Sequence, residues 1–122
     1  MNKTILIVED EKALLDILVY EFKKEGFIVL SEMNGKEGLR SAISNHPDLI
    51  LLDIIMPVMD GLIMLGKLRE DEWGKNVKVL LLTNLSDPNK ITTTILNTVS
   101  GLIVKSDWRI DDIIAEVKKT LT

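Results

Sequence analysis

The sequence predicts an α/β fold, a doubly wound parallel sheet of five strands in a single domain. Three observations predict it: short apolar runs recur along the chain, stretches of helical period separate them, and turn residues stand at the junctions. A strand that helices cover on both faces is apolar throughout, whereas a helix against a sheet is apolar along one stripe. The chain has the length of one domain, which we expect to span residues 1–122.

Five runs of apolar residues predict the strands, and the second of them is the weakest. In chain order they are Ile5–Val8, Phe27–Leu30, Leu49–Leu52, Val79–Leu82 and Leu102–Val104. Helical stretches lie between them, so the chain reads as successive β–α units. Such units place parallel strands in one sheet with helices on both faces.

Apolar spacing and turn residues delimit the first two helices. Leu14, Leu18 and Phe22 recur every four residues and predict a helix with one apolar stripe. Gly26 follows the charged end of that helix and suits its C-terminal turn. The second helix is expected between the Asn-Gly pair at 34–35 and the Asn-His-Pro turn at 45–47.

Capping residues and side-chain type predict the other three helices. Asp60-Gly61 precedes the third, and Asp87-Pro88 suits the N-cap and first residue of the fourth. The β-branched threonines at 92–94 form helices poorly, so we expect the fourth helix to be short or mobile. The last helix is predicted from the apolar stripe Ile110, Ile113, Ile114, Val117 and Leu121.

Composition excludes several classes of function. A net charge of −4 argues against direct binding of nucleic acid, which needs clustered Lys and Arg. The chain has no cysteine, hence no disulfide and no thiolate metal site. The apolar run Ile5–Val8 is too short for a signal peptide or for a membrane span of about 20 residues. We expect a cytoplasmic domain that does not enter a membrane.

Polar residues that can perform chemistry stand where the predicted strands end. In open parallel sheets, ligands bind outside the carboxyl ends of the strands, near the point where strand order reverses. We therefore expect these side chains to converge. In chain order they are Glu9 and Asp10, then Asp53, then Thr83 and Asn84, and finally Lys105.

These residues suit phosphoryl transfer to a carboxylate. Three carboxylates in one place repel one another, and a hard divalent cation such as Mg²⁺ relieves the repulsion. Lys105 adds a positive charge and Thr83 a hydroxyl that can contact phosphoryl oxygens. Asp53 is favoured as the acceptor because it stands alone after its strand, whereas adjacent Glu9 and Asp10 suit a paired metal anchor.

Four segments resemble the receiver domain of two-component response regulators: ILIVEDE at 5–11, LILLDIIMPVMDG at 49–61, LLLTN at 80–84 and GLIVKSD at 101–107. The resemblance covers the whole chain in order and spacing. It implies a flavodoxin-like, chemotaxis-type (βα)5 fold. It also implies a phosphoacceptor switch, rather than an enzyme with an external substrate, that dephosphorylates itself slowly.

The resemblance also implies a role for each residue at the strand ends. Asp53 would receive a phosphoryl group from the phosphohistidine of a sensor histidine kinase or phosphotransfer protein. Lys105 would pair with that group, and Thr83 would swing to bond it. Mg²⁺, with Mn²⁺ as the alternative, would be held by Glu9 through water, Asp10, Asp53 and the backbone carbonyl of Ile55.

Three residues depart from the family pattern. Asn84 stands where a very small residue is usual, so we expect it to slow phosphoryl entry or loss. Leu102 replaces the aromatic rotamer switch, so the output face must read a different side chain. Ser106 replaces a proline whose preceding bond is cis, and we favour a trans Lys105–Ser106 bond, because a non-proline cis bond costs roughly 3 kcal/mol.

The partners implied by the resemblance are the phosphodonor and an output protein or domain. Output would be contacted through the face made by the fourth helix, the fifth strand and the last helix. Ile91, Leu102 and Trp108 are our candidates for that contact, and a homodimer is left open.

Three rival functions differ in the residues that they need. A pseudo-receiver binds partners without phosphorylation, but such domains usually lack the acceptor, the acidic pair or the lysine. A phosphatase of the haloacid dehalogenase type places a second aspartate two residues after its nucleophile. Ile55 occupies that position here. A flavodoxin is disfavoured because the first β–α loop, EDEKA, is acidic and would repel a flavin phosphate.

Overall fold

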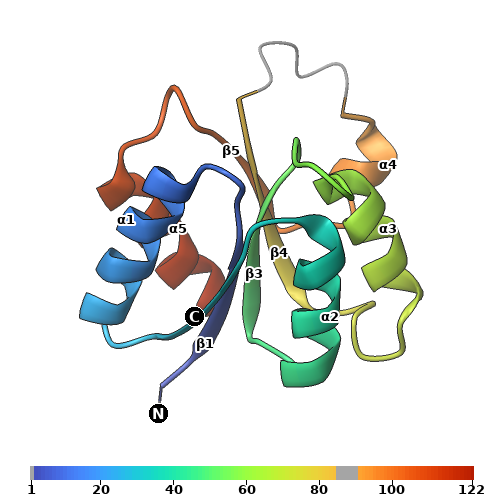
Figure 1. Ribbon diagram of the computed structural model, residues 1–122, viewed down its shortest axis with the longest axis horizontal. Coiled ribbons are helices and arrows are strands. Elements are labelled where there is room, and N and C mark those ends of the chain that lie inside the picture. Colours follow the sequence, from blue (N-terminus) through green and yellow to red (C-terminus); the bar gives the residue numbers. More distant parts are fainter. Residues whose placement is uncertain (1, 85–90) are drawn as a thin grey trace.

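The computed structural model describes residues 2–84 and 91–122, and within them five parallel strands form one sheet (Figure 1). The strand order is β2-β1-β3-β4-β5. The predicted α/β fold with a doubly wound, flavodoxin-like sheet is confirmed. The strands are β1 Thr4–Val8, β2 Ile28–Glu32, β3 Leu49–Asp53, β4 Lys78–Thr83 and β5 Gly101–Val104.

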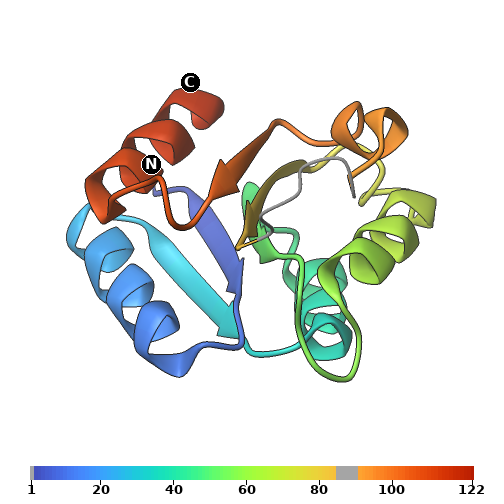
Figure 2. The same ribbon diagram turned by 90° about the horizontal axis from the view of Figure 1, so that it is seen from above.

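Helices cover both faces of this sheet. Figure 2 shows α1 and α5 on one side, and α2, α3 and α4 on the other. None of the helices within the described ranges is long and apolar enough to cross a membrane. The helices are α1 Lys12–Lys24, α2 Gly35–Asn45, α3 Gly61–Glu70, α4 Thr93–Leu96 and α5 Ile110–Leu121.

Two apolar layers form the core, one on each face of the sheet. Successive residues of a strand point to opposite faces. Ile5 and Ile7 of β1 therefore pack in the layer with α1 and α5, whereas Leu6 and Val8 pack in the layer with α2 and α3. Burial of each such side chain contributes about 2 kcal/mol. The need to fill both layers explains why residues 5–8, 49–52 and 79–82 of the central strands are apolar throughout.

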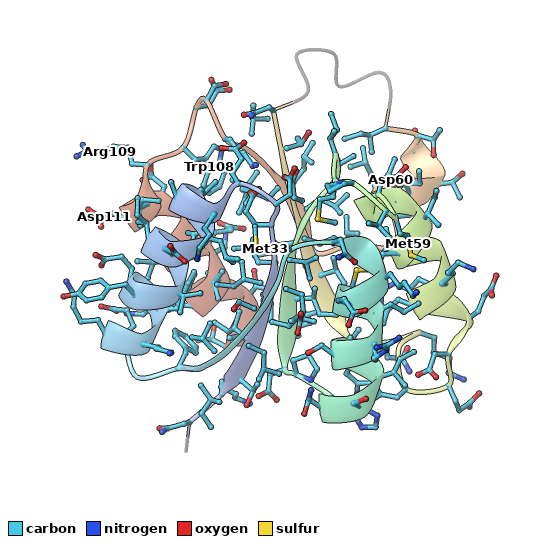
Figure 3. The ribbon with its side chains drawn as sticks, in the orientation of Figure 1. Met33, Met59, Asp60, Trp108, Arg109 and Asp111 are labelled. Atoms are coloured by element: carbon cyan, nitrogen blue, oxygen red, sulfur yellow. The ribbon has the colours of Figure 1, made fainter. Side chains whose placement is uncertain are left out.

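Local signals placed three helix ends correctly. Gly26 follows α1 with a φ of 97°, a left-handed conformation that glycine adopts without steric cost. The Asn34 side chain accepts a hydrogen bond from the Glu37 backbone N–H at 2.9 Å. Asp60, which Figure 3 labels, caps α3 by accepting from the Ile63 N–H at 2.9 Å.

The fourth helix is short, as predicted. It comprises the four residues Thr93–Leu96, and the Thr92 hydroxyl accepts from the Ile95 N–H at 3.2 Å. The predicted cap at Asp87-Pro88 lies outside the described residues. The helix is thus capped by a threonine from the β-branched run that weakens it.

The order of the strands reverses at β1. The chain leaves β1 to form β2 on one side of it and returns to form β3 on the other. The connections that follow β1 and β3 therefore diverge toward opposite faces and leave a crevice at the carboxyl ends of these strands. The residues that follow the strands line that crevice.

Candidate functional site

Polar side chains from β1, β3 and β4 are buried where these strands end. Glu9, Asp53 and Thr83 are 0%, 4% and 1% exposed. Burying a polar group costs free energy unless a partner compensates it. Three such residues in one place therefore mark a site with a purpose other than packing, at the predicted edge of the sheet.

Strand register brings these residues together. Val8 of β1 pairs with Leu52 of β3, so the next residues, Glu9 and Asp53, are neighbours. Thr83 at the end of β4 pairs with Val104 of β5. The residue after Val104 is Lys105, whose backbone N–H donates to the Thr83 carbonyl oxygen at 2.7 Å. Parallel pairing thus converts distant sequence positions into one cluster.

Three carboxylates of the site suit a hard cation. Glu9, Asp10 and Asp53 each offer one oxygen, and these oxygens all lie within 4.8 Å of one another. Glu9 Oε1 is buried and lies 2.6 Å from the Lys105 ammonium as an ion pair. Carboxylate oxygens that converge in this way are the hard ligands that Mg²⁺ prefers.

Lys105 supplies the positive charge that we expected from the fifth strand. Its side chain is 9% exposed, and its ammonium lies 3.2 Å from Asp53 Oδ2 and 3.3 Å from Glu11 Oε1. Burial lowers the pKa of Lys105, but the Glu9 and Asp53 carboxylates raise this pKa by more, so the amine stays charged. The Lys105–Ser106 bond is trans as predicted, since no described peptide bond is cis.

Burial and a like charge make the Asp53 carboxyl a weak acid. Burial first, and then Glu9, raise the pKa of Asp53 to about 8, against the opposing effect of Lys105. Two neighbouring carboxylates with one ammonium between them favour retention of a proton. A divalent cation at the same place would replace that proton and leave Asp53 ionised, the form that a nucleophile requires.

A cavity of about 200 Å³ opens onto this cluster. Asp53 and Lys105 are largely buried residues of its lining, whereas Asn84 is exposed. The Ile55 side chain is 59% exposed, and its backbone N–H donates to Asp53 Oδ1 at 3.4 Å. The described residues that line the cavity are Asp10, Glu11, Asp53, Ile55, Asn84 and Lys105. Every predicted site residue except buried Thr83 thus lines the cavity or, like Glu9, lies against Lys105.

Glu11 is the residue of this site that sequence reasoning did not single out. It is the N-cap residue of α1, and its side chain makes no capping hydrogen bond. It contacts Lys105 instead, 94 residues along the chain. The signal that was available is the third acid of the EDE triplet at 9–11.

Only two of the three residues proposed to contact an output partner are exposed to solvent even in part. Ile91 is 4% exposed and belongs to the core layer with α2 and α3, so that suggestion is wrong for this conformation. Leu102 and Trp108 are half-buried. Trp108 lies on the connection between β5 and α5 (Figure 3) and packs against the layer with α1 and α5.

Comparisons with known proteins agree on one family. The family described as the response regulator receiver domain matches residues 5–118. Response regulator ArlR of Staphylococcus aureus is 32% identical over 96% of this chain, and the uncharacterized transcriptional regulatory protein YkoG of Bacillus subtilis is 34% identical over 96%. The chain spans 52% and 50% of their lengths.

A solved structure shows the same likeness in three dimensions. Response regulator protein TrrA from Thermotoga maritima, in complex with Mg²⁺-BeF, superposes with a TM-score of 0.84 at 34% identity. The match covers 98% of this chain and 99% of that one.

Proposed function

The chain belongs to the response regulator receiver domain family of two-component signal transduction, and we propose that its Asp53 accepts a phosphoryl group in a Mg²⁺-dependent reaction. Receiver domains are phosphoacceptor switch modules. One observation carries the assignment to Asp53: its carboxylate lies 3.2 Å from the Lys105 ammonium, within the three-carboxylate cluster, and lines an open cavity.

Each side chain has a chemical role in this proposal. Glu9, Asp10 and Asp53, with the Ile55 carbonyl, would hold Mg²⁺ or Mn²⁺, which would neutralise charge on the phosphoryl oxygens. One Asp53 oxygen attacks phosphorus as the bond from phosphorus to the donor breaks, and the leaving group keeps the electron pair. Lys105 then shifts its ammonium from the carboxylates to the phosphoryl oxygens.

Thr83 and Asn84 lie at the end of β4, next to the site where the phosphoryl group would be attached. Thr83 is 1% exposed, and its hydroxyl would swing to donate to a phosphoryl oxygen. Asn84 at the cavity edge would narrow access to Asp53. We expect Asn84→Ala to change the rate of phosphorylation or of slow self-dephosphorylation, and equal rates in both proteins would refute this role.

Partners follow from the family and from the surface. The phosphodonor is a sensor histidine kinase or a phosphotransfer protein, and residues 1–122 act as one receiver in the cytoplasm. Output passes through the α4–β5–α5 face to a protein or domain, with Leu102 and Trp108 as contacts and homodimers left open. YkoG is named as a transcriptional regulator, but the charge of −4 argues that this domain does not itself bind DNA.

Incubation with acetyl phosphate and Mg²⁺ tests the proposal. Intact mass spectrometry should show the mass of one added phosphoryl group on the wild type. Asp53→Asn keeps the shape of the side chain without its nucleophilic charge and should gain nothing, and EDTA should abolish the adduct on the wild type. A wild type that gains no phosphoryl group would favour a pseudo-receiver, and an adduct on Asp53→Asn would place the acceptor elsewhere.

A further inference from the structure

Glu11 is a fourth carboxylate at the site, and the proposed chemistry gives it no role. Its side chain is 54% exposed, lines the 200 Å³ cavity and places Oε1 3.3 Å from the Lys105 ammonium. Glu9 and Asp53 are buried beside the same ammonium. Glu11 is therefore the carboxylate partner of Lys105 that solvent, or an arriving donor, reaches first.

The Glu11 side chain can extend toward the cavity because it does not cap its own helix. Residue 11 is the N-cap of α1, but glutamate is not among the residues that cap well there, and its side chain accepts no backbone N–H of the first turn. Its own backbone N–H donates to Glu9 Oε2 at 2.9 Å, which anchors the start of the helix to the site. The side chain is thereby left to reach across the cavity to Lys105.

The charges at the cavity explain why this contact affects the reaction. Among the described residues of the cavity lining, Lys105 is the one cation, against the carboxylates of Asp10, Glu11 and Asp53, and it also pairs with buried Glu9. Where Mg²⁺ engages Glu9, Asp10 and Asp53, Glu11 is the carboxylate that still holds Lys105. A phosphoryl anion must then take the ammonium from Glu11 and must also pass its negative charge.

We propose that Glu11 competes with the incoming phosphoryl anion for Lys105 and so disfavours small, free, anionic phosphodonors. The inference rests on the proposed function and deepens it by assigning donor selectivity to a named residue. A donor group carried by a protein can bring cationic side chains that offset the charge of Glu11, whereas a free acyl phosphate cannot. Glu11 is thus a positioning residue that acts through Lys105.

Glu11→Gln tests the competition because it removes the charge and nearly preserves the volume. Glu72→Gln is the matched control. Glu72 is 94% exposed, pairs with Lys75 and lies between α3 and β4, at the amino end of the strands and so away from the cavity. Both variants lose one negative charge. They separate an effect at the cavity from an effect of net charge.

Three measurements on residues 1–122 test the competition, which predicts that Glu11→Gln reacts faster with phosphodonors and binds beryllofluoride more tightly but does not bind Mg²⁺ more tightly. With acetyl phosphate, we expect Glu11→Gln to be phosphorylated about threefold faster than Glu72→Gln, the size expected for one exposed like charge. The gain should be smaller with phosphoramidate, which carries less negative charge. Calorimetry should show tighter binding of beryllofluoride, whereas Mg²⁺ affinity should stay equal or fall, because a nearby negative charge has been removed.

The outcomes separate this inference from the proposed function. If the wild type takes no phosphoryl group and binds no Mg²⁺, both are overturned. If the wild type is phosphorylated but Glu11→Gln matches Glu72→Gln with both donors, only the role of Glu11 is overturned. Weaker binding of both Mg²⁺ and beryllofluoride would show that Glu11 merely supports the structure, and would equally overturn the competition.

Discussion

Gly61 tests how closely α3 must approach the acceptor strand. A Cβ placed on Gly61 would lie 2.0 Å from the Asp53 carbonyl oxygen and 2.9 Å from the Ile54 Cα. Both are backbone atoms, so no side-chain rotation can relieve the clash. The Gly61 N–H also donates to the Ile54 carbonyl oxygen at 2.7 Å. Substitution by alanine must therefore push the start of α3 away from the strand end that carries Asp53.

We expect Gly61→Ala to lower the free energy of unfolding by about 3 kcal/mol, the upper end for overpacking, since only backbone can yield. Gly66 is the matched control on the same helix, because a Cβ there would meet no atom of the described residues within 4 Å. Gly66→Ala should raise the free energy of unfolding by about 0.5–1 kcal/mol through helix propensity. Urea denaturation measures both.

The reasoning is refuted if Gly61→Ala and Gly66→Ala have the same free energy of unfolding. A Gly61→Ala protein within about 0.5 kcal/mol of the wild type would mean that α3 can shift without cost. We also expect the shift to reach the site, so Gly61→Ala should gain phosphoryl groups more slowly from acetyl phosphate, and Gly66→Ala should not.

Three further predictions concern other features of the molecule. Asp53 has a raised pKa in the folded state, so without metal its ionisation opposes folding: the urea midpoint should fall as pH rises from about 5 to 8, and Asp53→Asn should flatten that slope. Arg69 donates to the Gly74 and Val77 carbonyls at 2.7 and 2.8 Å and to the Thr98 carbonyl. Arg69→Met should therefore lower the free energy of unfolding, measured by urea denaturation, by about 2–3 kcal/mol. Arg40 is exposed, and Arg40→Met should change that free energy by less than about 0.5 kcal/mol. Val58 is 77% exposed with a φ of 68°, and Val58→Gly should raise the thermal midpoint by relieving about 1 kcal/mol of strain, an effect that an unchanged or lower midpoint would contradict.

The strands were predictable because their signal is local and strong. Every residue of 5–8, 49–52 and 79–82 is fully buried, and a strand covered on both faces has no position that tolerates a charge. β2 lies at an edge of the sheet and carries exposed positions, including Ile28 at 49%, so its apolar run is weaker. Caps such as Asn34 and Asp60 were equally accessible, since a cap and its helix are neighbours in sequence.

Features that depend on distant contacts could not be predicted in this way. From the sequence we expected Ile91 on the surface, just before a weak helix, but it is buried in the core. From the sequence, Arg69 is an ordinary charged residue in the last turn of a helix, yet it donates to three carbonyl oxygens and so joins two connections, α3–β4 and α4–β5. In each case the partner lies in another element, and no spacing within the residue's own segment shows it.

By itself, the sequence determined which residues stand at the ends of the strands, and hence that carboxylates, a hydroxyl and a lysine would meet. Periodicity and strand length suffice for that, because parallel strands share one carboxyl edge. Only the tertiary structure decided how their charges are shared. It turned Glu11 from its helix toward Lys105 and buried Glu9 beside Asp53. Such pairing depends on distances and burial across the sheet, which the order of residues along the chain does not contain.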